Sequence, residues 1–278
     1  MLTHAADLEL ATRLAHEAGR AILAVDDEAR ARPTTKSDES PVTAADLASD
    51  RVIREGLAHL GDPIITEETW RGASVGPHPR AWFVDPIDGT EDFIAGRADY
   101  CVQIGLCVDG VPALGVIHQP STGATWRGVV TSGLCEAIDG HGRVHRRRVD
   151  TRGLPQRPRI AISVSHPSQV VDYIVEELGG VPVPKGSVGL KIGLIVDGEA
   201  DAYLTASKRI KVWDTCAPAA VLLAAGGLVT SLVETSLRFD GPAAHDAGVC
   251  AWTPAARAAL NPKVQEAVVR FSLVGPSR

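Results

Sequence analysis

The sequence predicts a layered protein of mixed α and β structure, and three observations lead to this prediction. Segments with helical spacing of apolar residues alternate with short apolar runs typical of strands. The chain has 278 residues and 45% hydrophobic content, which is enough for a sizeable buried core. Several of the strand-like runs end on acidic residues, as they do where α/β folds place ligands. We divide the chain into two closely packed halves, residues 1–150 and 151–278.

The composition argues against nucleic acids and membranes as partners. A formal net charge of -6 does not suggest a surface for a nucleic-acid polymer, and we expect the short basic run at 143–148 to be a solvated turn or strand edge. No apolar run is long enough for a membrane span, and the N-terminal segment lacks a signal-peptide core. The five cysteines form no CxxC pair, so we expect reduced thiols in a cytoplasmic protein.

Two helices are expected near the start of the chain. Apolar spacing predicts the first over residues 5–28, and the polar, proline-containing residues 30–42 then predict a mobile loop. The second helix should run from Thr43 to about Leu60, because Thr43 and Asp46 fit an N-cap with an acid three residues later.

The rest of the first half favours strands. Short apolar runs predict strands at 63–66 and 81–85, each followed by or ending on acidic residues. From 100 to 130 the pattern is that of β structure, and the Asp-Gly pair at 109–110 predicts a hairpin turn.

Strands and helices alternate in the second half. We expect the joint between the halves at residues 150–158, where glycine, prolines and polar residues gather. The expected strands lie at 159–165 and 201–205. The expected helices lie at 167–178, 188–198, 214–225 and 254–269.

Acidic residues mark the ends of several of these elements. In the stretch WFVDPIDGTEDF, Asp85 ends an apolar run and Asp88 follows three residues later. Glu67 follows another strand, and Asp214 begins a helix. Carboxylates that converge on one crevice repel one another unless a cation lies between them. Ligation by oxygen alone suits Mg²⁺ or Mn²⁺.

The residues between and after the two aspartates favour a phosphate site beside the metal. Pro86 fixes one backbone torsion and can turn the Ile87 carbonyl toward the same point as the acids. Gly89 and Thr90 precede a short helix whose free N–H groups suit an anion. The spacing D-x-x-D-G-T fits neither an EF-hand nor an aspartyl-nucleophile phosphatase with D-x-D-G-T. Taken alone, the motif also fits a turn with capping acids, so metal-assisted phosphoryl chemistry stays one of two interpretations.

Four ordered motifs resemble those of the inositol monophosphatase superfamily of Mg²⁺-dependent, lithium-sensitive phosphatases. Residues 82–96 resemble its first signature, 212–227 its second, 66–68 its glutamate motif, and 36–46 its mobile metal loop. The resemblance covers nearly the whole chain. It implies an α-β-α-β-α sandwich of the inositol monophosphatase and fructose-bisphosphatase type.

The resemblance also implies a set of metal ligands. Glu67, Asp85 and the Ile87 carbonyl would hold one Mg²⁺, and Asp85, Asp88 and Asp214 would hold a second. A third, weaker ion would bind near Glu67 through water, and Mn²⁺ could substitute.

Catalytic roles follow from the same resemblance. Thr90 with Asp46 would orient the attacking water, Glu67 would polarise that water through the metal, and Gly89 with Thr90 would bind the scissile phosphate. Glu68 is expected to be a neighbour rather than a ligand. The attack would be in line, without a covalent enzyme intermediate.

The resemblance implies a small phosphorylated substrate, whose identity the family leaves open. Residues 163–168 and 187–204 resemble segments of bisphosphate nucleotidases, which implies hydrolysis of adenosine 3',5'-bisphosphate to AMP within sulfur metabolism. Lys191 would then bind the second phosphate, His166 the base or ribose, and Asp214 would also touch the substrate. Alternatively, Lys191 is a surface lysine and His166 a helix cap. An inositol or sugar phosphate and a non-catalytic metal-binding role are the other functional hypotheses, and the chain would be a monomer or a homodimer.

Overall fold

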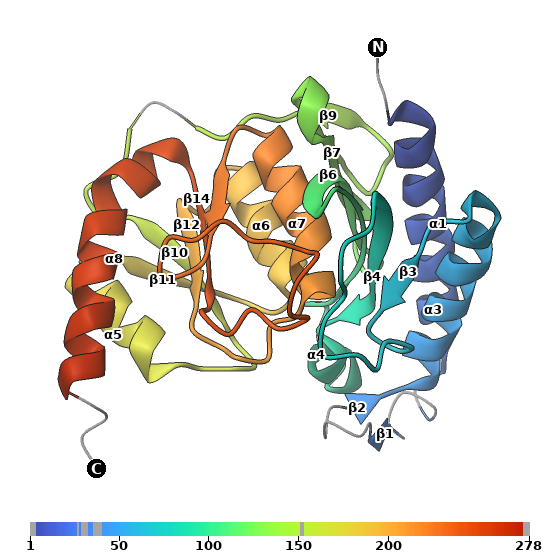
Figure 1. Ribbon diagram of the computed structural model, residues 1–278, viewed down its shortest axis with the longest axis horizontal. Helices are drawn as coiled ribbons and strands as arrows, with labels where there is room; N and C mark the ends of the chain where they lie inside the picture. Colours follow the sequence, from blue (N-terminus) through green and yellow to red (C-terminus); the bar gives the residue numbers. More distant parts are fainter. Residues whose placement is uncertain (1–3, 27, 29–32, 36–40, 151–152, 275–278) are drawn as a thin grey trace.

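Two large β-sheets and three layers of helices build the molecule in this computed structural model, which describes residues 4–26, 28, 33–35, 41–150 and 153–274 (Figure 1). Helices α1 and α3 cover one face of a seven-stranded sheet, and α6 and α7 lie between its other face and a five-stranded sheet. Helices α5 and α8 cover the outer face of the second sheet. The predicted α-β-α-β-α order is thus confirmed.

The seven-stranded sheet contains all of the strands predicted for the first half. Its strands lie in sequence order from β3 to β9, with β3 parallel to β4 and the remaining pairs antiparallel. They are β3 (Ile64–Thr66), β4 (Arg80–Asp88), β5 (Cys101–Val108), β6 (Val111–Gln119), β7 (Ala124–Val129), β8 (Leu134–Ile138) and β9 (Val144–Arg146). The turn at Asp109 and Gly110 has φ angles of 51° and 72°, as the predicted hairpin requires.

Three details of this sheet differ from the prediction or extend it. Strand β4 does not stop at Asp85 but continues to Asp88 through a register shift against β5. Strands β8 and β9 were not predicted. The basic run at 143–148 includes the exposed edge strand β9, as expected of a strand edge.

Helices α1 (Ala5–Leu23) and α3 (Ala44–Leu57) pack their apolar faces on this sheet. Helix α1 ends earlier than predicted, and a 3-10 turn, η1 (Ala58–Leu60), follows α3. The predicted cap is present, since Thr43 and Asp46 form a reciprocal capping box. Within the predicted loop, β1 (Thr34–Thr35) pairs with β2 (Pro41–Val42), while residues 30–32 and 36–40 lie outside the described part.

The second sheet has the order β11-β10-β12-β14-β13. Its strands are β10 (Arg159–Ser163), β11 (Val181–Lys185), β12 (Ala202–Thr205), β13 (Leu228–Thr230) and β14 (Val249–Trp252). Its outer helices are α5 (Gln169–Glu177) and α8 (Pro254–Val274). Strands β11, β13 and β14 were not predicted, and part of the predicted joint, residues 151–152, lies outside the described residues. Among the described residues, no helix is both long and apolar enough to cross a lipid bilayer.

Helices α6 (Val188–Val196) and α7 (Val212–Ala224) form the central layer and are buried on nearly all sides. Helix α7 lies directly on strand β6, because a Cβ atom added at Gly115 would lie 2.2 Å from the Ala217 carbonyl oxygen. A 3-10 turn, η2 (Val130–Ser132), follows β7, and a short helix, α4 (Thr90–Ile94), follows β4. The close approach fixes the N-terminus of α7, which carries Asp214, relative to the first sheet.

We expect Gly115→Ala to destabilise the protein by about 1–3 kcal/mol, the usual cost of overpacking a tightly packed interior. The added methyl would have to displace the α7 backbone rather than a flexible side chain. Gly241→Ala is the matched control, because a Cβ there meets nothing within 4 Å. Urea unfolding of both variants measures the difference, and equal stabilities would contradict the close packing of α7.

Candidate metal and phosphate site

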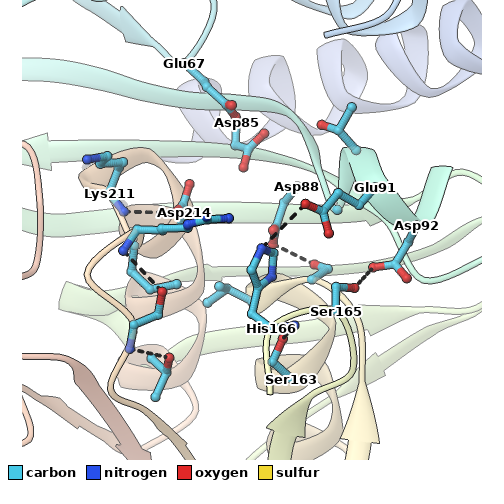
Figure 2. Close-up of a pocket in the computed structure, with 18 of the residues that line it drawn as sticks. Glu67, Asp85, Asp88, Glu91, Asp92, Ser163, Ser165, His166, Lys211 and Asp214 are labelled. Atoms are coloured by element: carbon cyan, nitrogen blue, oxygen red, sulfur yellow. Dashed lines mark hydrogen bonds and ion pairs between the residues drawn. The ribbon is translucent and has the colours of Figure 1, made fainter. Parts of the chain in front are cut away.

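A cavity of about 360 Å³ lies between the two halves and is lined by both. The first half contributes residues from the ends of β3 and β4 and from α4, and the second half contributes residues around β10, α6, β12 and α7 (Figure 2). All the acidic residues that the sequence predicted as metal ligands line this cavity.

Three of these carboxylates converge at one end. Glu67 follows β3, Asp85 lies in β4 and Asp214 in the first turn of α7, and oxygens of the three groups all lie within 4.8 Å of one another (Figure 2). Asp85 is 2% exposed. Three carboxylates and the Ile87 carbonyl at the same cavity form a donor set of oxygen alone, which suits a hard divalent cation such as Mg²⁺.

The backbone around Asp85 and Ile87 is held by hydrogen bonds. The Ile87 amide donates to Asp85 Oδ1 at 3.1 Å, and Ser49 Oγ donates to the Pro86 carbonyl at 2.9 Å. The proline and the register shift at this point turn the strand so that Asp85 and Asp88 line the same cavity.

Asp214 is held by the start of its own helix and crowded by other acids. Its Oδ2 accepts a hydrogen bond from the Lys211 amide at 2.8 Å. Burial, and then the negative charges of Asp88 and Glu67, raise the pKa of Asp214 well above its usual value. The charged form is therefore disfavoured in the protein alone, and a bound cation would favour it.

Asp88 is hydrogen-bonded to residues of the second half. Its Oδ2 accepts hydrogen bonds from Ser187 Oγ at 2.6 Å, from the Gly189 amide at 3.0 Å and from the Gln103 side chain. Burial raises the pKa of Asp88, while the charge of Lys191 opposes this rise. Asp88 thus joins the predicted metal site to the start of α6.

Thr90 and Asp46, the two residues expected to orient the attacking water, are hydrogen-bonded to each other. Thr90 Oγ1 lies 3.0 Å from both Asp46 Oδ1 and the Ile87 carbonyl oxygen. The other Asp46 oxygen accepts from the amide and the hydroxyl of Thr43, at 2.8 and 2.6 Å. Gly89 has a φ of 98°, and a Cβ there would lie 2.8 Å from the Asp99 carbonyl oxygen, so the position requires glycine.

The two predicted specificity residues differ in accessibility. His166 is partly exposed, its amide donates to Ser163 Oγ at 3.1 Å, and its Nε2 lies 3.7 Å from Glu91 Oε1 across the cavity (Figure 2). Lys191 is only 3% exposed. Its Nζ donates to the Ser187 carbonyl at 2.8 Å and lies 5.3 Å from the Tyr203 ring centre, and burial lowers its pKa to about 8.

Sequence reasoning missed several residues that shape the cavity. Ser187 holds a φ of 54°, unusual for a residue with a side chain, while its hydroxyl binds Asp88. Gln103, a buried polar residue in a strand, gave no local signal. The cations Lys208 and Arg209 line the cavity, and they could have been noticed as basic residues shortly before the second signature. Glu68 does not line the cavity, as expected of a neighbour.

Comparison with known proteins identifies relatives over most of the chain. The sequence profile of the inositol monophosphatase family matches residues 5–268. The 3'(2'),5'-bisphosphate nucleotidase CysQ of Salmonella typhimurium is 34% identical over 230 residues, which cover 80% of this chain and 89% of that protein. The 3'-phosphoadenosine 5'-phosphate phosphatase of Mycobacterium leprae is 32% identical over 84% of each chain.

Solved structures share the fold. CysQ from Bacteroides thetaiotaomicron has a TM-score of 0.75 at 24% identity, covering 91% of this chain and 99% of that one. The inositol monophosphatase from Anabaena has a TM-score of 0.72 at 23% identity, covering 95% and 96%.

We expect Asp85→Asn to abolish most magnesium binding without unfolding the protein. The amide can still accept the hydrogen bond from Ile87, and loss of one negative charge relieves repulsion, so the metal-free stability should stay equal or rise. Added Mg²⁺ should raise the melting temperature of the wild type through binding linkage and raise that of the variant much less. Turnover should fall at least about 100-fold.

Glu68→Gln is the control for this experiment, because it makes the same kind of change beside Glu67 on a side chain that does not line the cavity. Its response to Mg²⁺ should match that of the wild type. An Asp85→Asn protein stabilised by Mg²⁺ as strongly as the wild type would contradict the assignment of this carboxylate as a ligand.

Proposed function

The chain belongs to the inositol monophosphatase family, and we propose that it is a Mg²⁺-dependent phosphatase that converts adenosine 3',5'-bisphosphate to AMP and phosphate. The relatives named above as bisphosphate nucleotidase and as 3'-phosphoadenosine 5'-phosphate phosphatase support this substrate. The five free, buried cysteines agree with the cytoplasmic setting that we propose, and the substrate would place the enzyme in sulfur metabolism.

The observation that carries the proposal is the convergence of Glu67, Asp85 and Asp214 in one cavity with Thr90. In the proposed assignment, Glu67, Asp85 and the Ile87 carbonyl hold one ion, and Asp85, Asp88 and Asp214 hold another. Bound Mg²⁺ would supply charge stabilisation of the phosphoryl oxygens and a water of lowered pKa. A third ion near Glu67 belongs to the same proposal.

The chain's own residues would position the attacking water. The Thr90 hydroxyl has one proton, which it gives to Asp46 Oδ1 or to the Ile87 carbonyl. Its lone pairs can then accept a hydrogen bond from a water molecule. Thr43 binds the other Asp46 oxygen, so the Asp46 carboxylate is held against the Thr90 hydroxyl. The water would then be oriented toward a phosphate bound near Gly89 and Thr90.

The remaining lining suits a nucleoside. Val188, Ile210 and Trp213 offer apolar surface to a flat base, and His166 with Glu91 offers polar groups. Ser163 and Ser165 add hydroxyl groups at the same cavity. A cavity with apolar walls and a few polar groups is typical of small-ligand sites.

A substrate panel at saturating Mg²⁺ tests the proposed function. We expect adenosine 3',5'-bisphosphate to have the highest kcat/KM, ahead of inositol 1-phosphate. The Asp85→Asn variant, purified and assayed in the same way, is the control, because any activity that it keeps at the wild-type level would come from contaminating phosphatases. A preference of tenfold or more for inositol 1-phosphate would overturn the proposal in favour of a sugar-phosphate phosphatase, and no turnover of any phosphomonoester would favour a non-catalytic role.

Lithium should inhibit the enzyme. A small monovalent ion at the second proposed metal site supplies less charge than Mg²⁺ and should slow release of phosphate. Titration with LiCl at fixed Mg²⁺, with NaCl at equal ionic strength as the control, measures this effect. Full activity at tens of millimolar lithium would contradict the proposed second metal site.

A further inference from the structure

The segment between β12 and α7 brings positive charge to a cavity whose other charged lining residues, Lys191 apart, are mostly acidic. Lys208 and Arg209, both exposed, line the cavity together with Lys211. Residues 205–213 contain no acidic side chain. By contrast, the acidic residues lining the cavity are Glu67, Asp85, Asp88, Glu91, Asp92 and Asp214.

The backbone of this segment is held in place although its cationic side chains are exposed. The Ser207 amide donates to Thr205 Oγ1 and the Arg209 amide donates to Ser207 Oγ, each at 3.2 Å. At its other end, the His245 amide donates to the Ile210 carbonyl at 2.9 Å. A positioned backbone lowers the cost of ordering these side chains around an anion.

Neither the Lys208 ammonium nor the Arg209 guanidinium is neutralised by an acidic side chain in the described part of the protein. Lys208 and Arg209 form no ion pair with a described residue, although six carboxylates line the same cavity. Their charges are therefore available to a ligand. An anion bound there would avoid the repulsion that it would meet near Asp85, Asp88 and Asp214.

Lys191 is less suited to hold an incoming anion. Its ammonium already donates to the Ser187 carbonyl, and its charge lies near that of Asp88. A phosphate drawn to Lys191 would have to lose its hydration in a buried place beside a carboxylate, which is costly. Lys191 can instead offset the buried negative charge of Asp88.

We propose that Lys208 and Arg209 bind the second phosphate of the substrate, the one that is not removed, and so determine the preference for bisphosphate over monophosphate nucleotides. This inference rests on the proposed function. It assigns the metal end of the cavity to the transferred phosphate and the cationic segment to the other. Arg209 can make two parallel hydrogen bonds to a phosphate, whereas Lys208 supplies a point charge.

The test compares adenosine 3',5'-bisphosphate with adenosine 3'-monophosphate, which differs only by lacking the second phosphate. The readout is the ratio of the two kcat/KM values. In the double variant K208A/R209A this ratio should fall at least about tenfold, the lower end of what hydrogen bonds to charged groups contribute. Arg209→Lys should restore part of the ratio. In the wild type, added salt should raise KM for the bisphosphate more than for the monophosphate.

The control is R143A/R146A, which removes the same charge from the end of the exposed edge strand β9 and from the residue just before it, at the far edge of the first sheet. Its ratio should equal that of the wild type. If the wild type prefers the bisphosphate and K208A/R209A keeps that preference, the inference is wrong while the proposed function stands. If the wild type hydrolyses neither nucleotide, the proposed function itself fails.

Discussion

Repulsion among carboxylates that the fold holds together is the constraint on which the rest of the site depends. Glu67, Asp85 and Asp214 come from two parallel strands and a helix start, and each is positioned by backbone rather than by a flexible segment. The fold must therefore supply the energy to keep like charges close, and the packing of α7 on the first sheet through Gly115 contributes to it. A cation bound between the three carboxylates would replace their mutual repulsion with a net attraction.

The two halves are joined in different ways near the cavity and away from it. Away from it, the central layer forms one apolar core with residues from both halves. At the cavity the connections are polar: Asp88 with Ser187, and Ser165 with Asp92. Ser187 carries backbone strain at this point, which is typical of residues that a functional site holds in an uncommon conformation. Asp88 thus hydrogen-bonds the first half of the site to the start of α6.

The chemistry of the site could be predicted from the sequence better than its recognition of a particular ligand. The acids, Gly89 and Thr90 lie in short motifs whose local geometry is set by a proline and a glycine. Strand β11, with the sequence VPVPK, was missed because alternating prolines hide a strand at a sheet edge. The burial of Lys191 could not be inferred, because a helix that is apolar on all sides has no face that distinguishes one position from another.

The division of charge in the cavity gives a physical reason why this fold serves more than one substrate. Most of the converging carboxylates belong to the first half, whereas the exposed cations Lys208 and Arg209 belong to a connection in the second half. Connections tolerate substitution more readily than packed elements do. A change of charge on this connection can alter which phosphorylated ligands the cavity accepts, according to the second group that they carry. It does so without moving Glu67 or Asp85. Likeness of fold alone therefore cannot distinguish a nucleotide from an inositol phosphate, and in the proposed assignment the charges on that connection make the distinction.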